Sequence, residues 1–142
     1  MICIECGFDQ TNKKKVTEAF GVLLCETHKS QIEEILIKMN QPNEVGEFYY
    51  GLKKIGLKPL KGWWNGKRIV PISLSRSRIN IEFYNSNAIH NHKEALKRQE
   101  IESEDHQQHF ICLQIPLEFL KSQLKETANL IYTLNEGLKN YS

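Results

Sequence analysis

Two short stretches decide how the first part of this chain folds: Cys3-Ile4-Glu5-Cys6-Gly7 and, about twenty residues later, Leu24-Cys25-Glu26-Thr27-His28. Two thiolates separated by two residues on a tight turn can point at one ion, and the glycine lets the turn bend back. The second stretch places a cysteine and a histidine at the expected start of a helix. Three sulfurs and one imidazole nitrogen suit a tetrahedral zinc ion and leave no open position. The spacing therefore predicts a structural zinc site formed by Cys3, Cys6, Cys25 and His28.

The alternative interpretation is a reduced Cys-x-x-Cys pair beside an unrelated cysteine and histidine. A redox pair is less consistent with the sequence, because such pairs open a helix after a strand and no strand precedes Cys3. The fourth cysteine, Cys112, lies far away in an apolar run, where we expect it to be a small buried residue.

The residues between the two ligand pairs predict a short hairpin whose second strand leads into Cys25. A knuckle, a hairpin and a helix that carries two ligands resemble the treble-clef zinc finger over roughly the first 39 residues. We expect a first domain over residues 1–41, in which metal binding supplies folding free energy of order 10 kcal/mol. The run Asn40-Gln41-Pro42-Asn43 marks the boundary to a second domain over residues 42–142.

The composition is that of a globular protein. The 142 residues are 40% hydrophobic and 25% charged, with a net charge of +2 that is too small to identify a nucleic-acid binder. Because no apolar run approaches the roughly 18 residues of a membrane span, and the N-terminus lacks signal-peptide features, we expect a cytoplasmic protein without a membrane partner. No glycine-rich phosphate loop is present, which argues against a nucleotide cofactor.

The hydrophobic pattern predicts an α/β arrangement. A helix starting near Thr27 is followed by a second helix that Asn43 caps and Gly56 ends. Beyond it we expect three strands, a polar helix, an acidic loop, a strand covered on both faces and a last helix starting at Pro116, over residues 57–64, 68–74, 78–84, 87–102, 100–105, 109–115 and 116–138. After the finger, the predicted order is therefore α-β-β-β-α-β-α.

That order resembles the restriction-endonuclease-like, or PD-(D/E)xK, nucleases over about residues 43 to 140. Arg78 to Phe83 look like the strand that carries the family's acid, and His92 to Leu96 like the helix after it. Phe110 to Pro116, followed by Leu124 to Ala128, are similar to the closing strand and helix of the branch related to very-short-patch-repair nucleases. The resemblance implies a nuclease-like fold and, where the active site is complete, magnesium-dependent cleavage of DNA.

The active site of this family is incomplete in the sequence. Glu82 stands where the family's acid belongs, and it is the one catalytic candidate. The stretch from Lys53 to Ile81 contains no Asp or Glu, and Tyr84 stands where a lysine is expected. One carboxylate holds a catalytic magnesium poorly, so we expect an inactive fold in which Glu82 is a partly exposed strand residue paired with a nearby Lys or Arg. The alternative is a Mg²⁺-dependent endonuclease with relocated ligands, namely Glu47, Glu82 and His90.

A basic run lies between the second helix and the third strand. Residues 53–78 hold eight Lys or Arg residues and no acid, with two tryptophans in their middle, and Lys13 to Lys15 add charge in the finger. Cations attract phosphates and aromatic rings stack on bases, so the run predicts nucleic-acid binding, with DNA favoured over RNA. The predicted contacts are Lys61, Trp63, Trp64, Lys67, Arg68, Arg76 and Arg78.

Two other interpretations of these residues remain open. Lysines protect exposed sheet edges, with tryptophans in the core beneath them, so the run can also be a solvated edge. The acidic segment and the tryptophan pair can instead serve a protein-interaction or inhibitor module. Either the pair His90 and His92 or the pair His106 and His109 could ligate a metal, but surface positions are the preferred interpretation of these histidines.

Overall fold

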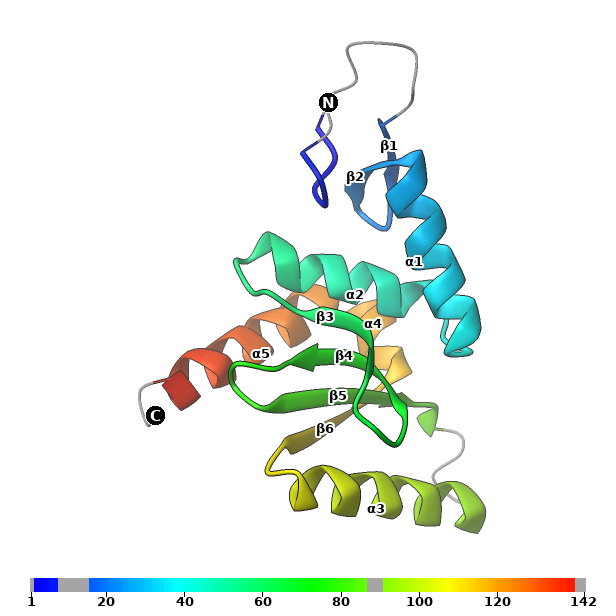
Figure 1. Ribbon diagram of the computed structural model, residues 1–142, viewed down its shortest axis with the longest axis vertical. Coiled ribbons are helices and arrows are strands. Elements are labelled where there is room, and N and C mark those ends of the chain that lie inside the picture. The colour runs from blue at the N-terminus through cyan, green and yellow to red at the C-terminus, as the bar shows by residue number, and fades with distance from the viewer. Residues whose placement is uncertain (1, 8–15, 87–90, 140–142) are drawn as a thin grey trace.

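The computed structural model describes residues 2–7, 16–86 and 91–139 (Figure 1). The N-terminal part consists of a knuckle at residues 2–7, an antiparallel hairpin of β1 (Val16–Ala19) and β2 (Val22–Cys25), and helix α1 (Glu26–Lys38). This confirms the predicted hairpin and the helix that follows it. The backbone of Ile4 donates to Leu23 at 2.9 Å, which holds the knuckle against the hairpin.

The remainder forms one mixed sheet with helices on both faces. Its elements are α2 (Asn43–Lys54), β3 (Leu60–Trp64), β4 (Ile69–Leu74), β5 (Ile79–Tyr84), α3 (His92–Gln107), β6 (Ile111–Pro116), α4 (Leu117–Ser122) and α5 (Leu124–Lys139). The strand order is β3-β4-β5-β6, with two antiparallel pairings and a parallel pairing of β5 with β6. The mixed α/β character and the interior position of the strand that carries Glu82 are as predicted.

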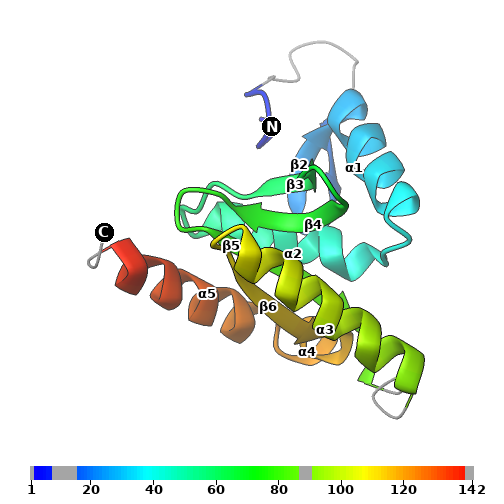
Figure 2. The same cartoon turned by 60° about the horizontal axis from the view of Figure 1, so that its bottom comes forward.

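The two faces of the sheet differ in chemistry because successive strand residues point to opposite sides. Ile72 and Ile81 pair across β4 and β5 and are buried in the apolar core, where Phe48 of α2 meets Phe83 with ring centroids 5.9 Å apart. The alternate residues Ser73 and Asn80 are polar and also fully buried. Figures 1 and 2 show α2, α4 and α5 on the apolar side and α3 on the polar side.

Two predicted segments of the second half are wrong. The acidic residues 100–105 are not a loop, because α3 continues to Gln107. At the C-terminal end of this helix, the carbonyl of Asp105 accepts a hydrogen bond from the N–H of Phe110 at 2.8 Å. The predicted last helix is in fact two helices, α4 and α5, because Gln123 leaves the helical conformation with φ −138° and ψ 41°. A single apolar stripe continues across this break, so periodicity did not reveal it.

Smaller differences concern the ends of elements and one edge. Asn43 begins α2 instead of capping it, since Pro42 holds the cap position without a side-chain hydrogen bond. Asn91 caps α3, accepting from the backbone of Lys93 and Glu94, and residues 87–90 of the predicted helix lie outside the described residues. The strand β6 lies at the sheet edge, where Ile111 remains 41% exposed, so the predicted burial on both faces holds only in part.

The N-terminal part, up to the end of α1, packs closely onto α2 and the sheet. Buried residues of both parts, such as Leu24, Ile32 and Val45, belong to one continuous apolar cluster. Two glycines permit the close approach: a Cβ on Gly46 would lie 2.8 Å from the Phe20 ring, and one on Gly62 would lie 2.9 Å from Cγ2 of Ile35. The predicted segments 1–41 and 42–142 therefore share a core.

Candidate metal centre

The four predicted zinc ligands come together from three elements. Cys3 and Cys6 lie on the knuckle, Cys25 ends β2 and occupies the position before α1, and His28 lies in the first turn of that helix. Their ligand atoms all lie within 4.8 Å of one another, and this cluster could hold a metal ion. It is the one group of three or more metal-ligating side chains that occurs within residues 2–7, 16–86 and 91–139.

The distances fit a tetrahedral zinc site. The Sγ of Cys25 lies 3.1 Å from Nδ1 of His28, the Sγ of Cys3 lies 3.8 Å from the same nitrogen, and the Sγ atoms of Cys6 and Cys25 lie 3.9 Å apart. Zn–S and Zn–N bonds of about 2.3 and 2.0 Å at tetrahedral angles give ligand separations of about 3.5 to 3.8 Å. The observed separations scatter around these values, so the set could hold a tetrahedral metal ion such as zinc, with Nδ1 the His28 nitrogen that faces the sulfurs.

The backbone around the knuckle favours the thiolate that a metal requires. Burial alone would raise the pKa of Cys3, but hydrogen bonds from the backbone at Cys25, Cys6 and Glu5 outweigh it and lower that pKa. Because the chain supplies four ligands, the site leaves no position for water or substrate, which is typical of a structural metal site.

The residue between the first two ligands ties the knuckle to the sheet domain. The carboxylate of Glu5 is 6% exposed; it accepts from Nζ of Lys61 at 2.6 Å and forms a second ion pair with Lys53. Burial would raise the pKa of Glu5, and the two ammonium groups together outweigh burial and lower it. Lys61, a predicted nucleic-acid contact, is thus engaged within the protein.

A second charged cluster surrounds Glu82 on the polar face of the sheet. Arg68 donates from Nε to Glu82 at 2.9 Å and from Nη2 to Asp105 at 3.1 Å, with Glu104 3.4 Å from Nη1. The turn positions Arg68, since Oδ1 of Asn65 accepts from its N–H at 2.8 Å. Pairing of Glu82 with an arginine is as predicted, but Arg68, whose side chain is 17% exposed, is thereby engaged as a structural cation.

The protonation of this cluster follows from its burial. Burial, the largest cause, raises the pKa of Glu82, although the positive charge of Arg68 opposes it. Burial would lower the pKa of Arg68, but the hydrogen bonds to Asp105 and Glu82 outweigh it and raise that pKa. Asp105 is completely buried and also accepts from Nδ2 of Asn80 at 3.2 Å.

Sequence reasoning missed Glu104, Asp105 and Asn80 as members of this cluster. Arg68 and Asp105 are 37 residues apart, and no local pattern links them. Gln114 of β6 donates from Nε2 to the carbonyl of Arg98 at 3.1 Å and so joins β6 to α3.

The other predicted nucleic-acid contacts separate into two places. Trp64, 60% exposed, lies with exposed Lys67 where β3 turns into β4. The exposed residues Arg76 and Arg78 lie in the turn at the opposite end of β4, which is six residues or about 20 Å long. Trp63 is half-buried, with its ring centroid 5.8 Å from that of Phe110.

The relocated ligands of the enzyme interpretation do not form one group. Glu47 is exposed on α2, which covers the apolar face, whereas Glu82 lies beneath α3 on the polar face. His90, like Lys13 to Lys15, lies outside the described residues. His92, His106 and His109 are exposed, which confirms their prediction as surface residues.

Comparison with known proteins identifies no family for this chain. No protein-family model, curated protein or solved structure matches this chain. None of the described helices has both the length and the apolar character needed to cross a membrane.

Proposed function

We propose that this chain is a non-catalytic, zinc-stabilised domain with a nuclease-like fold that binds nucleic acid, DNA in preference to RNA. The observation that carries the proposal is the engagement of Glu82 by Arg68. A catalytic magnesium ion needs free carboxylate oxygens and a position for water. Oε1 of Glu82 instead accepts from Nε of Arg68 and lies 2.9 Å from its Nη2, so the guanidinium occupies the place of a metal.

The exposed cations at the β4–β5 turn support the nucleic-acid part of the proposal. Lys58, Ser75 and Arg76 line a hollow of about 310 Å³, and Arg78 lies nearby with its guanidinium 5.8 Å from the centre of the Phe110 ring. Exposed lysine and arginine side chains that contact phosphates release the counterions condensed on them. Contacts of this kind position a protein on nucleic acid without reading the sequence.

Titration of the zinc-loaded chain with duplex DNA, single-stranded DNA and RNA tests the proposal. We expect binding that weakens as the salt concentration rises. The double substitution Arg76→Glu and Arg78→Glu should weaken binding further. It should also reduce the slope of log K against log salt concentration on duplex DNA by about 1.8, the value for two lost phosphate contacts. Lys121→Glu, an exposed lysine on α4, is the matched control. Absence of binding at micromolar protein and low salt would refute nucleic-acid binding, and an equal loss in the control would refute its assignment to Arg76 and Arg78.

Incubation with DNA and Mg²⁺ tests the non-catalytic part. We expect no cleavage by the wild-type chain. Metal-dependent cleavage that Glu82→Gln abolishes would overturn the proposal in favour of the endonuclease. Cleavage that persists in this variant, and that co-purifies with an unrelated protein prepared in parallel, indicates contamination.

A protein-interaction module is the second candidate. It is favoured by Trp64 and Ile69, which form a cross-strand pair and are 60% and 45% exposed. Large apolar side chains that remain exposed together are typical of interaction surfaces. If no nucleic acid binds, this pair becomes the first surface to substitute.

A further inference from the structure

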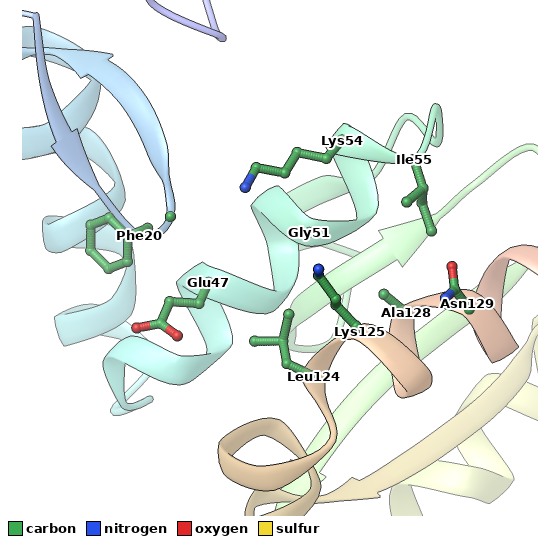
Figure 3. Close-up of a pocket in the computed structure, with 10 residues that line it drawn as sticks. Phe20, Glu47, Gly51, Lys54, Ile55, Leu124, Lys125, Ala128 and Asn129 are labelled. Atoms are coloured by element: carbon green, nitrogen blue, oxygen red, sulfur yellow. The ribbon is translucent and has the colours of Figure 1, made fainter.

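A cavity lies between the tip of the β1–β2 hairpin, α2 and the start of α5, away from the zinc ligands and the Arg68 cluster (Figure 3). Its volume is about 310 Å³, at the lower end of the range of small-molecule sites. Apolar atoms form most of its wall, contributed by Phe20, Ile55, Leu124 and Ala128. The cavity is therefore large enough and apolar enough to hold a small organic molecule.

Three charged side chains border this apolar wall. Lys54 and Glu47 reach it from α2 and Lys125 reaches it from the first turn of α5, around the opening at Gly51 (Figure 3). Among the ion pairs of the described residues, none involves these three groups. Two ammonium groups and one carboxylate leave a net charge of +1, which a monoanion would neutralise.

The hairpin turn and two glycines of α2 shape the wall of the cavity. Phe20 has φ 54° and Gly21 has φ 75°, so a bulky aromatic residue occupies the left-handed region that such residues rarely adopt. This conformation presses the Phe20 ring against α2 at Gly46. A Cβ on Gly51 would lie 3.3 Å from Cδ2 of Leu124, so the absence of a side chain there leaves the space free.

We propose that this cavity binds a small carboxylic acid with an apolar body. Its carboxylate would lie between Lys54 and Lys125, and its hydrocarbon part against Phe20 and Leu124. At about 30 Å³ for each water displaced, the cavity accommodates about ten non-hydrogen atoms. Glu47 keeps the net charge low, which favours a monocarboxylate over a phosphate or a dicarboxylate.

The test uses the full zinc-loaded chain, hydrocinnamate as the probe, and its neutral amide, hydrocinnamamide, as the matched ligand. Heteronuclear NMR follows the backbone amides of Gly21 and Gly51. We expect saturable shifts at both glycines with hydrocinnamate and weaker binding of the amide. The double substitution Lys54→Gln and Lys125→Gln should weaken hydrocinnamate about tenfold, since each exposed ion pair contributes a factor of about two to five. Binding of the amide should be unchanged.

Two controls separate binding from folding. Lys121→Gln changes an exposed lysine outside the cavity and should leave both affinities as they are. Gly51→Leu fills the cavity and should abolish binding of both probes while a folded spectrum is retained. No saturable shift at Gly21 and Gly51 at millimolar hydrocinnamate would overturn the proposal. Equal affinity for acid and amide, or wild-type affinity in the double variant, would also overturn it.

Discussion

Replacing Arg68 with leucine tests whether this residue is a surface cation or a structural one. Within the sequence it belongs to a basic run that predicts phosphate contacts. Within the fold its side chain is 17% exposed, and its guanidinium reaches Glu82 on β5 and Asp105 on α3, whose side chains are 13% and 0% exposed. Leucine retains an apolar stem but removes every one of these hydrogen bonds.

The expected loss of stability is large because three carboxylates would be left without their cation. Removing one partner of a buried ion pair costs about 3 to 5 kcal/mol, since the remaining charge stays desolvated. For a chain of this length, about 1 kcal/mol corresponds to a shift of about 4 °C in Tm, so we expect a decrease of about 10 to 20 °C. Arg76→Leu, an exposed arginine of the same run, should change the unfolding free energy by no more than about 0.5 kcal/mol.

Urea unfolding at neutral pH and at about pH 5 completes the test. Burial already raises the pKa of Glu82, and loss of Arg68 removes the positive charge that opposes this rise. A carboxyl whose pKa is higher in the folded than in the unfolded state destabilises the fold when ionised, and protonation relieves this cost as the pH falls. The difference between Arg68→Leu and wild type should therefore narrow on acidification. A difference below about 1 kcal/mol at neutral pH, or one that widens in acid, would refute this reasoning.

Three further predictions concern the finger, one glycine and the distant cysteine. The purified chain should hold one zinc ion, and the Cys6→Ser variant should lose it. The Glu5→Gln variant should keep the metal but have an unfolding free energy lower by about 1.5 to 3 kcal/mol. Metal analysis and urea titration measure the two quantities, and loss of zinc from the Glu5 variant would contradict this prediction. Gly62→Ala should destabilise the fold by about 2 kcal/mol, because φ at Gly62 is +58° and the new Cβ would lie 2.9 Å from Cγ2 of Ile35. Gly137→Ala, in open space on α5, should be neutral or stabilise the fold by up to about 1 kcal/mol. Equal melting temperatures of the two variants would count against the packing argument. Burial, assisted by nearby carboxylates, raises the pKa of Cys112 to about 12, so its thiol should react slowly with a disulfide reagent at pH 8 until urea is added; fast reaction in the folded, metal-bound chain would show that it is accessible as a thiolate.

The metal cluster could be predicted from the sequence because its geometry is local. Cys3 and Cys6 share one turn, and Cys25 and His28 share one turn of helix, so each pair is positioned by its own backbone. Only one long-range step, the approach of the knuckle to β2, had to be assumed. The same holds for the order of helices and strands, which follows from hydrophobic periodicity.

The charged residues could not be assigned in this way. Residues 53–78 contain no acid, so the sequence predicts a positive field. Folding brings Glu5 against Lys53 and Lys61, and brings Glu82 and Asp105 against Arg68, from positions that are 14 to 56 residues away along the chain. What appeared as one basic run is therefore divided into internal ion pairs and two separate exposed sites.

The sequence by itself thus determined the Cys3, Cys6, Cys25 and His28 cluster that could hold a metal ion, and the mixed α/β class, since each depends on residue type and short spacing. The tertiary structure alone decided which cations remain exposed, that α3 includes the acidic segment, and that a cavity opens between α2 and α5. The physical reason is the distance along the chain over which each effect acts. Ligand spacing and periodicity act over a few residues, whereas the neutralisation of a charge depends on whichever opposite charge the fold brings within about 3 to 4 Å.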